Sequence, residues 1–202
     1  MSDLFDYLNE GISGLHPYEP GRSIEDVIAE YRPEKIVKLA SNENPLGPSP
    51  KAVEALKLHN DDLHLYPDGD SKKLKALIAK HESLDVSNII VGNGSNEVLE
   101  LAARAFLNKD TSALMSKHAF AVYKIVTQSN GSKIIEVPTV DWRHALNDFS
   151  NYIEDSTRVC FVANPNNPTG TYNSHDEFKS MMDSIPSSIL VILDLAYFEY
   201  VT

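Results

Sequence analysis

The segment GNGSNEVLE, residues 92–100, places glycines at the start of a helical pattern. Glycine lets the backbone approach a ligand closely, and the first N–H groups of a helix point at any anion lying there. Gly94, Ser95 and Asn96 are therefore candidates for holding a phosphate group. A simple strand-to-helix turn with a capping serine explains the segment equally well when it is taken alone. A dinucleotide fingerprint is not favoured, because Glu97 stands where that motif needs a third glycine.

The segment NPNNPTG, residues 164–170, follows a second apolar run. Pro168 restricts the backbone, and Gly170 permits a turn that few other residues adopt. Three asparagines, among them Asn167, are left near the end of the expected strand. Asn–Pro pairs are also common turn formers, so shaping the loop is the alternative role of these side chains.

Asp194 ends a third apolar run, ILVILD. A carboxylate in this position is costly to bury unless it has a partner. Either this strand end is solvated, or the partner is a cation that the nearby sequence does not supply, because no Lys or Arg follows. A protonated pyridine nitrogen would serve, and Asn167 and Tyr197 would then lie near an oxygen on the same ring. With phosphate at Gly94–Asn96, all of these sites fit a single cofactor.

The elements that position these residues are apolar runs alternating with amphipathic helical patterns. Strands are expected at residues 35–40, 88–92, 112–115, 133–138, 158–163 and 189–194. The alternation predicts an α/β fold with a mostly parallel sheet that carries helices on both faces. In such sheets the ligand binds outside the carboxyl ends of the strands, which is where the candidate residues lie.

Composition restricts the classes of function. The chain has 202 residues and a net charge of −11, which disfavours binding to nucleic acid or to an anionic membrane surface. No apolar run is long enough for a membrane helix, and the first residues do not resemble a secretory signal. The single cysteine, Cys160, lies in an apolar run and is interpreted as a buried small hydrophobe. A cytoplasmic protein is expected.

Six segments together carry a family resemblance: LASNENPLGPSP, LYPDG, GNGSNEVLEL, HAFAVY, ANPNNPTG and VILDLAYFEY. They closely resemble segments of the histidinol-phosphate aminotransferases, which are pyridoxal-phosphate enzymes of fold type I, class II. The NPNNPTG segment is shared with many fold-type I aminotransferases. The combination of SNENPLG with YPDG is narrower and favours the histidinol-phosphate branch.

The resemblance implies pyridoxal 5′-phosphate as the cofactor and a set of residues that bind it. These residues are Gly94, Ser95 and Asn96 at the phosphate, Phe120 stacked on the ring, Asn167 and Tyr197 at the ring oxygen, and Asp194 at the ring nitrogen. Tyr66 resembles the tyrosine that reaches the cofactor phosphate of the neighbouring subunit, which implies a homodimer. Tyr18 and Asn42 are implied to contact the substrate. Ordinary packing is the alternative role for Phe120 and Tyr18.

By the same resemblance, residues 1–40 form an N-terminal arm and part of the small domain, and residues 41–202 form the N-terminal portion of the cofactor-binding large domain. The Schiff-base lysine is expected downstream of Thr202, so no catalytic residue is expected in this chain, and the chain alone is expected to be inactive. Family members often carry Glu after the pyridine-binding Asp, where this chain has Leu195.

The implied reaction is transamination between histidinol phosphate and 2-oxoglutarate in histidine biosynthesis. Two alternatives keep the fold and change the chemistry or substrate: an aromatic amino-acid aminotransferase and a phosphothreonine decarboxylase. A further alternative is a non-catalytic, truncated paralogue.

Overall fold

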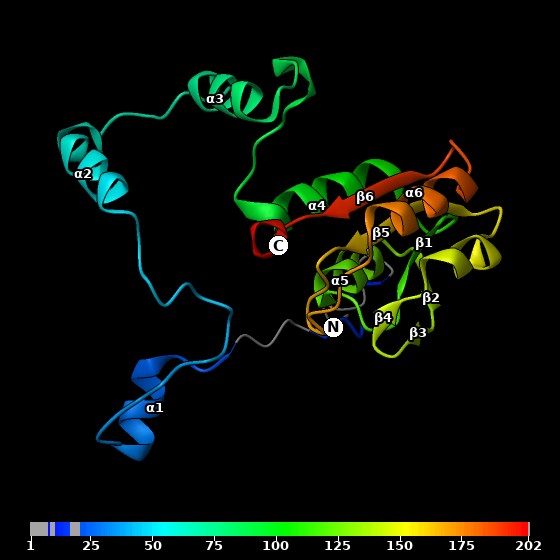
Figure 1. The fold of residues 1–202 in the computed structure, drawn as a ribbon, viewed down its shortest axis with the longest axis horizontal. Helices are drawn as coiled ribbons and strands as arrows, with labels where there is room; N and C mark the ends of the chain where they lie inside the picture. The colour runs from blue at the N-terminus through cyan, green and yellow to red at the C-terminus, as the bar shows by residue number, and fades with distance from the viewer. Residues whose placement is uncertain (1–7, 9–10, 17–20, 202) are drawn as a thin grey trace, which may run out of the picture. The chain divides into compact units, whose positions relative to one another are not determined.

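The computed structural model describes residue 8, residues 11–16 and residues 21–201 of the chain (Figure 1). Its helical elements are α1 Ile24–Tyr31, α2 Pro50–Leu58, η2 Asn60–Asp62, α3 Lys72–Glu82, η3 Val86–Asn88, α4 Gly94–Phe106, α5 Ala121–Ser129, η4 Leu146–Tyr152, α6 His175–Ser184 and η5 Phe198–Tyr200. Its strands are β1 Ser112–Ser116, β2 Lys133–Val137, β3 Thr139–Val140, β4 Arg143–His144, β5 Thr157–Ala163 and β6 Leu190–Asp194.

The chain divides into two compact units. Unit 1 comprises residues 1–18 and 92–202, and unit 2 comprises residues 19–91. The domain boundary expected near residue 40 concerns the family's domains and stays a prediction.

A four-stranded parallel sheet in the order β2-β1-β5-β6 forms the centre of unit 1. The expected strands at 112–115, 133–138, 158–163 and 189–194 are these four, so the predicted α/β fold with a parallel sheet is confirmed. Ser116 pairs with Val137, and Ala163 pairs with Asp194. The strands therefore present their carboxyl ends at a common edge, which carries the candidate site.

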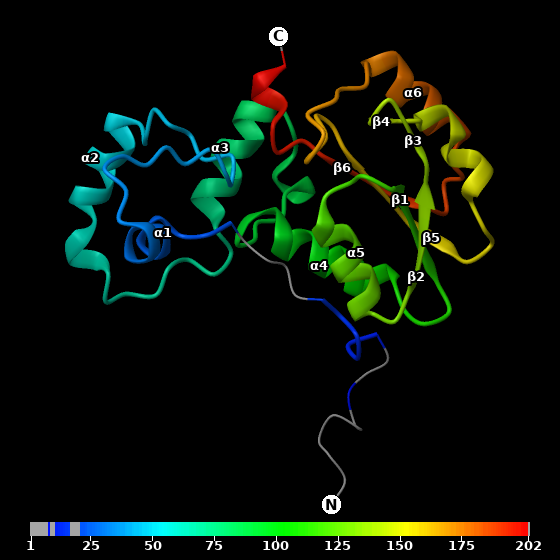
Figure 2. The same ribbon diagram turned by 90° about the horizontal axis from the view of Figure 1, so that it is seen from below.

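Both faces of this sheet are covered, because successive strand residues point to opposite sides. On one face, Leu99 and Ala103 of α4 and Tyr123 and Val126 of α5 pack against strand residues that include Phe161. On the other face lies a second buried cluster that joins η4, α6 and the sheet; its members include Leu114, Val137, Leu146, Phe149, Cys160, Val162 and Met181. Figure 2 shows the sheet between these two helical layers. This sandwich explains why the strand sequences are almost continuously apolar.

Unit 2 consists of α1, α2, η2, α3 and η3 joined by extended segments. The strands expected at residues 35–40 and 88–92 are wrong: among the described residues both segments lie outside any strand. A strand exists only where a neighbouring backbone accepts and donates its hydrogen bonds, and no described segment pairs with either. Several of their apolar side chains are exposed, with Leu39 at 88% and Ile90 at 68%, although Ile89 is buried at 9%.

A two-stranded antiparallel hairpin, β3–β4, was not expected from the sequence. Val140 pairs with Arg143, so Asp141 and Trp142 form a two-residue turn, and both have positive φ (49° and 65°). Such turns normally carry Asn-Gly or Asp-Gly, and the absence of glycine here removed the usual signal. Across the described ranges of the chain, no helix has the length and apolar character needed to cross a membrane.

Candidate functional site at the carboxyl edge of the sheet

Asp194 is the last residue of β6 and lies beside Ala163 at the end of β5. Its Oδ2 accepts a hydrogen bond from the Tyr123 hydroxyl at 2.8 Å, and its Oδ1 accepts one from the Ala196 N–H at 3.1 Å. Both donors are neutral, and no lysine or arginine within the described residues forms an ion pair with this carboxylate. The structure thus fixes both oxygens of a half-buried acid and leaves its charge uncompensated.

Tyr123, on α5, is the residue that sequence reasoning missed at this edge. It is completely buried, and its ring stacks on Phe161 with centroids 4.9 Å apart and an interplanar angle of 9°. The pKa of Tyr123 lies well above its ordinary value, first because the phenol is buried and second because the Asp194 carboxylate is close. The phenol therefore remains a neutral donor to Asp194 at any physiological pH.

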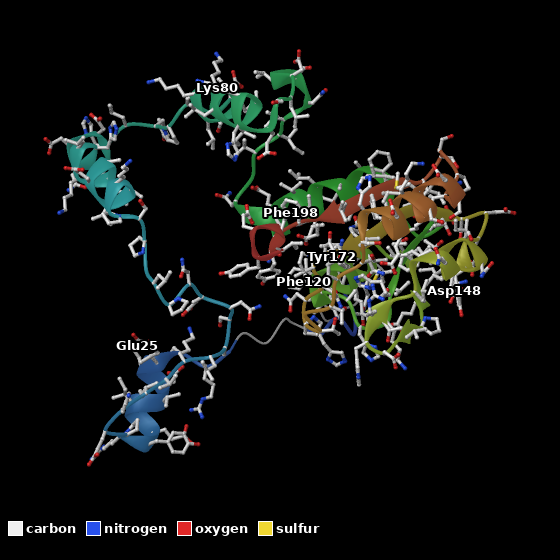
Figure 3. The ribbon with its side chains drawn as sticks, viewed as in Figure 1. Glu25, Lys80, Phe120, Asp148, Tyr172 and Phe198 are labelled. Atoms are coloured by element: carbon white, nitrogen blue, oxygen red, sulfur yellow. The ribbon has the colours of Figure 1, made fainter. Side chains whose placement is uncertain are left out.

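Phe120 precedes α5 as its N-cap residue and is half-buried. Its ring meets the Tyr123 ring edge-on, with centroids 5.7 Å apart and planes at 89°. Phe120 and Asp194 are thus linked through a single tyrosine. Figure 3 shows Phe120 and Tyr172 at this end of unit 1, whereas Asp148 lies farther along the sheet.

The asparagine loop, defined here as residues 164–171, begins beside Asp194, because the Asn164 N–H donates to the Asp194 carbonyl at 2.9 Å. The side chain of Asn164 closes the base of the loop: its amide donates to the Asn173 carbonyl and its oxygen accepts from the Asn173 N–H, both at 2.9 Å. Asn164 is therefore a loop-shaping residue, as one of the two sequence interpretations held.

Asn166 is also buried, at 3% exposure. Its Nδ2 donates to the His118 carbonyl and to Thr169 Oγ1, each at 2.7 Å. Its Oδ1 is buried and accepts no hydrogen bond from any described residue. Asn167, next in the chain, is half-buried and precedes one of the two cis peptide bonds of the loop, Asn167–Pro168. The side chains of Asn164 and Asn166 thus form hydrogen bonds that shape the loop, and the Asn167 side chain lies at its tip.

The first turn of α4 contains Gly94, Ser95 and Asn96, all exposed. Gly94 has φ +74°, and a Cβ placed there would have no neighbour within 4 Å, so the backbone is open to close approach. Glu97 folds back to accept from the Asn93 N–H at 2.5 Å and from Asn93 Nδ2 at 3.1 Å. The N–H groups of Ser95 and Asn96 have no carbonyl partner inside the helix, as expected for a first turn.

The remaining predicted site residues fall in different places. Tyr197 follows β6 and is half-buried, near Asp194 in the chain. Asn42 and Tyr66 belong to unit 2; Asn42 has φ +51°, and the Tyr66 side chain is 99% exposed. Tyr18 lies outside the described residues. The structure therefore brings together Phe120, Asp194 and the asparagine loop, and it does not test the substrate-side and neighbouring-subunit assignments.

A buried histidine forms hydrogen bonds to the ends of β1 and β5 at the same edge of the sheet. His144 of β4 is 3% exposed; its Nε2 lies 2.8 Å from the Ala163 carbonyl and its Nδ1 lies 2.7 Å from Ser116 Oγ. A carbonyl only accepts, so Nε2 carries the proton and Nδ1 accepts from the serine. Burial lowers the pKa of His144, which favours this neutral form. In the described parts of the chain, no group of three or more His, Cys, Asp or Glu side chains could hold a metal ion.

Comparison with known families decides the class of protein. A family model described as aminotransferase class I and II matches residues 34–202 of the chain. The chain belongs to the class I and II aminotransferase family. The six resembling sequence segments are thereby accounted for, and the strand-end site is a site on an aminotransferase scaffold.

Among curated relatives of this aminotransferase chain are histidinol-phosphate aminotransferase 2 of Pseudomonas fluorescens and histidinol-phosphate aminotransferase of a Geobacillus species. The first is 45% identical over 200 residues, which are 98% of this chain and 54% of that protein. The second is 44% identical over 191 residues, 95% of this chain and 52% of that protein. The chain thus spans about half the length of the curated relatives it matches.

A solved structure of similar fold is histidinol-phosphate aminotransferase from Sinorhizobium meliloti in complex with pyridoxal-5′-phosphate. The TM-score is 0.86 at 22% sequence identity, covering 96% of this chain and 52% of that chain. At this identity the likeness shows the fold alone, which agrees with the parallel sheet of unit 1.

Proposed function

We propose that the carboxyl edge of the unit 1 sheet is the cofactor site of a pyridoxal-phosphate-dependent aminotransferase. The observation that carries this proposal is Asp194, a carboxylate held by two neutral donors and without a cationic partner among the described residues. A protonated pyridine nitrogen is the complement that such an acid lacks. When bound, the cofactor supplies an electron sink for the substrate's α-carbon.

The residues present fit such a group, and each has a definite task. Asp194 would hold the proton on the ring nitrogen, while Tyr123 and Ala196 keep its oxygens oriented. Phe120 would cover one face of the cofactor ring. The edge-on contact with Tyr123 would hold the Phe120 ring in position. The open backbone at Gly94 and the first N–H groups of α4 suit a phosphate.

Further assignments complete the proposal. Asn167 and Tyr197 would donate to the ring oxygen, Tyr66 would serve the cofactor of a second copy in a homodimer, and Asn42 and Tyr18 would face the substrate. The proposed domains are residues 1–40 as an arm with part of the small domain and residues 41–202 as the cofactor-binding portion. We place the protein in the cytoplasm.

Three lysines of unit 1 are engaged in ion pairs. Lys124 pairs with Glu136, Lys133 with Glu154 and Lys179 with Asp183, and no described lysine contacts Asp194. We expect the amine that binds the cofactor covalently to come from residues outside this chain. We expect the 202 residues alone to bind the cofactor without catalysing transamination.

The substrate proposed is histidinol phosphate, with 2-oxoglutarate as amino acceptor. The support is the group of relatives at 44–45% identity that carry this activity in their names. A panel of histidinol phosphate, phenylalanine, tyrosine and phosphothreonine, assayed with the protein that contains this chain, tests the choice. Turnover of phenylalanine or of phosphothreonine, with none of histidinol phosphate, would replace it with one of the two alternatives.

The cofactor site is tested by equilibrium binding of pyridoxal phosphate to the chain and to Asp194→Asn. Losing one charge-assisted hydrogen bond should weaken binding by about tenfold or more. Asp148→Asn is the matched control, because Asp148 is an exposed aspartate of η4 in the same unit. Equal affinity of the wild type and Asp194→Asn would refute the role given to Asp194.

A further inference from the structure

The β3–β4 hairpin holds both flanks of the asparagine loop through three consecutive residues. The Trp142 carbonyl accepts from Thr171 Oγ1 at 3.2 Å, and Arg143 Nη2 donates to the Tyr172 carbonyl at 2.8 Å. On the opposite flank, His144 donates to the Ala163 carbonyl at 2.8 Å. A short surface hairpin thus contacts the chain just before the loop and at its end.

The turn of this hairpin carries a residue that its backbone does not favour. Asp141 and Trp142 both have positive φ, and turns of that kind favour glycine. Burial does not account for the tryptophan, because Trp142 is 63% exposed. A bulky residue kept in a disfavoured conformation at the surface points to a function for its side chain.

The Trp142 side chain packs on His118, with ring centroids 4.7 Å apart. His118 is held in turn by Thr139 of β3, whose Oγ1 lies 2.8 Å from the His118 Nδ1. The His118 carbonyl accepts from Asn166 Nδ2, at 2.7 Å. The tryptophan ring therefore packs against His118, the residue whose carbonyl holds Asn166 inside the asparagine loop.

Hydrogen bonds inside the asparagine loop connect Asn166 back to the hairpin. Asn166 Nδ2 also donates to Thr169 Oγ1 at 2.7 Å, and Thr169 Oγ1 lies 2.8 Å from Thr171 Oγ1. Thr171 then donates to the Trp142 carbonyl. These contacts form a closed chain, called the circuit below, from the hairpin to His118, through the asparagine loop and back to the hairpin. His118, Trp142 and Thr169 also line a surface hollow.

We propose that the β3–β4 hairpin is a brace for the asparagine loop and that Trp142 is the positioning residue of this brace. The consequence for the site is indirect: the brace fixes Asn166 and thereby the direction of Asn167. The link to cofactor binding rests on the proposed function, whereas the brace itself is a property of the fold.

The test is amide hydrogen exchange on the chain and on four variants. The reporters are the Gly170 N–H, which donates to the Asn166 carbonyl, and the Asn166 N–H, which donates to the Thr171 carbonyl, both at 2.8 Å. Trp142→Gly removes the ring and relaxes the turn, and Trp142→Phe keeps a ring. Asp141→Gly is the matched control, because it relaxes the same turn and leaves Trp142 in place.

Thr171→Val breaks the circuit independently and keeps the shape of the side chain. Trp142→Gly and Thr171→Val should speed exchange at the two reporters by about fivefold, with the amides of β5 unchanged. Trp142→Phe and Asp141→Gly should stay within about twofold of wild type. The proposal is overturned if Trp142→Gly and Asp141→Gly behave alike at the reporters, or if Thr171→Val leaves them unchanged.

Pyridoxal-phosphate affinity, measured on the same proteins, separates the brace from the proposed function. Faster loop exchange together with weaker binding supports both. Faster loop exchange with unchanged affinity supports the brace and contradicts the role given to Asn167. A wild-type chain that does not bind pyridoxal phosphate contradicts the proposed function, and the exchange rates then decide the brace by themselves.

Discussion

The hydrogen bond from Tyr123 to Asp194 joins residues 71 positions apart and can be tested by removing one oxygen atom. Tyr123→Phe keeps the ring that stacks on Phe161 and meets Phe120, so packing is preserved. A hydrogen bond to a charged group stabilises by about 1.5–3 kcal/mol. Asp194 is only half-buried and water can replace the lost donor, so we expect the free energy of unfolding to fall by about 1 kcal/mol at pH 8.

The pH dependence of the stability difference between the wild type and Tyr123→Phe is a more specific test than its size at pH 8. The pKa of Tyr123 in the folded chain lies above the ordinary 10.0 of an unfolded tyrosine. The contribution of the phenol to stability is therefore complete below pH 10 and is lost as the pH rises above it, because the unfolded chain then ionises first. The loss is about 1.4 kcal/mol per pH unit. Tyr123→Phe lacks this loss of stability. The mutant should therefore become more stable than the wild type near pH 10.5–11, and its advantage in the free energy of unfolding should then grow by about 1.4 kcal/mol per pH unit.

Urea unfolding from pH 8 to pH 11.5, followed by circular dichroism and by the emission of the single tryptophan, Trp142, measures this difference in unit 1. Tyr152→Phe removes a hydroxyl from a partly exposed tyrosine of η4 and should keep the wild-type pH dependence. A stability difference between wild type and Tyr123→Phe that stays constant above pH 10 would show that the phenol is not buried against Asp194.

Three further predictions concern other residues of unit 1. The pKa of His144 lies below its ordinary 6.5 because the ring is buried, so the stability of unit 1 should fall as the pH drops below 6.5, and urea unfolding of His144→Gln should lack this loss. Burial raises the pKa of Cys160 to about 12, so a disulfide reagent at pH 8 should react with this thiol only after unfolding in urea. Gly11 has φ +94°, and a Cβ there would lie 2.0 Å from the Gln128 carbonyl oxygen. Gly11→Ala should therefore cost about 1 kcal/mol or more and speed proteolytic cleavage near residue 11.

The sheet of unit 1 was predictable because its strands are buried on both faces. An apolar run between two amphipathic helices, such as residues 112–115 between α4 and α5, is typical of a buried parallel strand in an α/β protein. Residues 35–40 and 88–92 carry the same kind of local signal and form no strand, because strand formation also depends on a pairing partner. Periodicity records the apolar pattern but contains no information about the partner.

The candidate site could be proposed from the sequence only where a residue type has distinctive chemistry. An acid at a strand end pointed to Asp194 and an asparagine-proline segment pointed to the loop, and their roles at a cofactor stay predictions. Tyr123 looked like an ordinary core residue, since its role depends on an aspartate brought near only by folding. Trp142 gave no turn signal because glycine is missing from its hairpin. Residues that act through tertiary contacts were therefore the ones that the sequence concealed.

One molecule of pyridoxal phosphate is proposed to span the first turn of α4, the asparagine loop and the end of β6. A nitrogen–proton correlation NMR titration of the labelled chain tests it directly. The amides of residues 94–96, 166–167 and 194–196 should shift along one saturation curve with pyridoxal phosphate, and only those of residues 94–96 should shift with inorganic phosphate. Separate saturation curves for these segments, or shifts confined to other parts of the chain, would contradict the account.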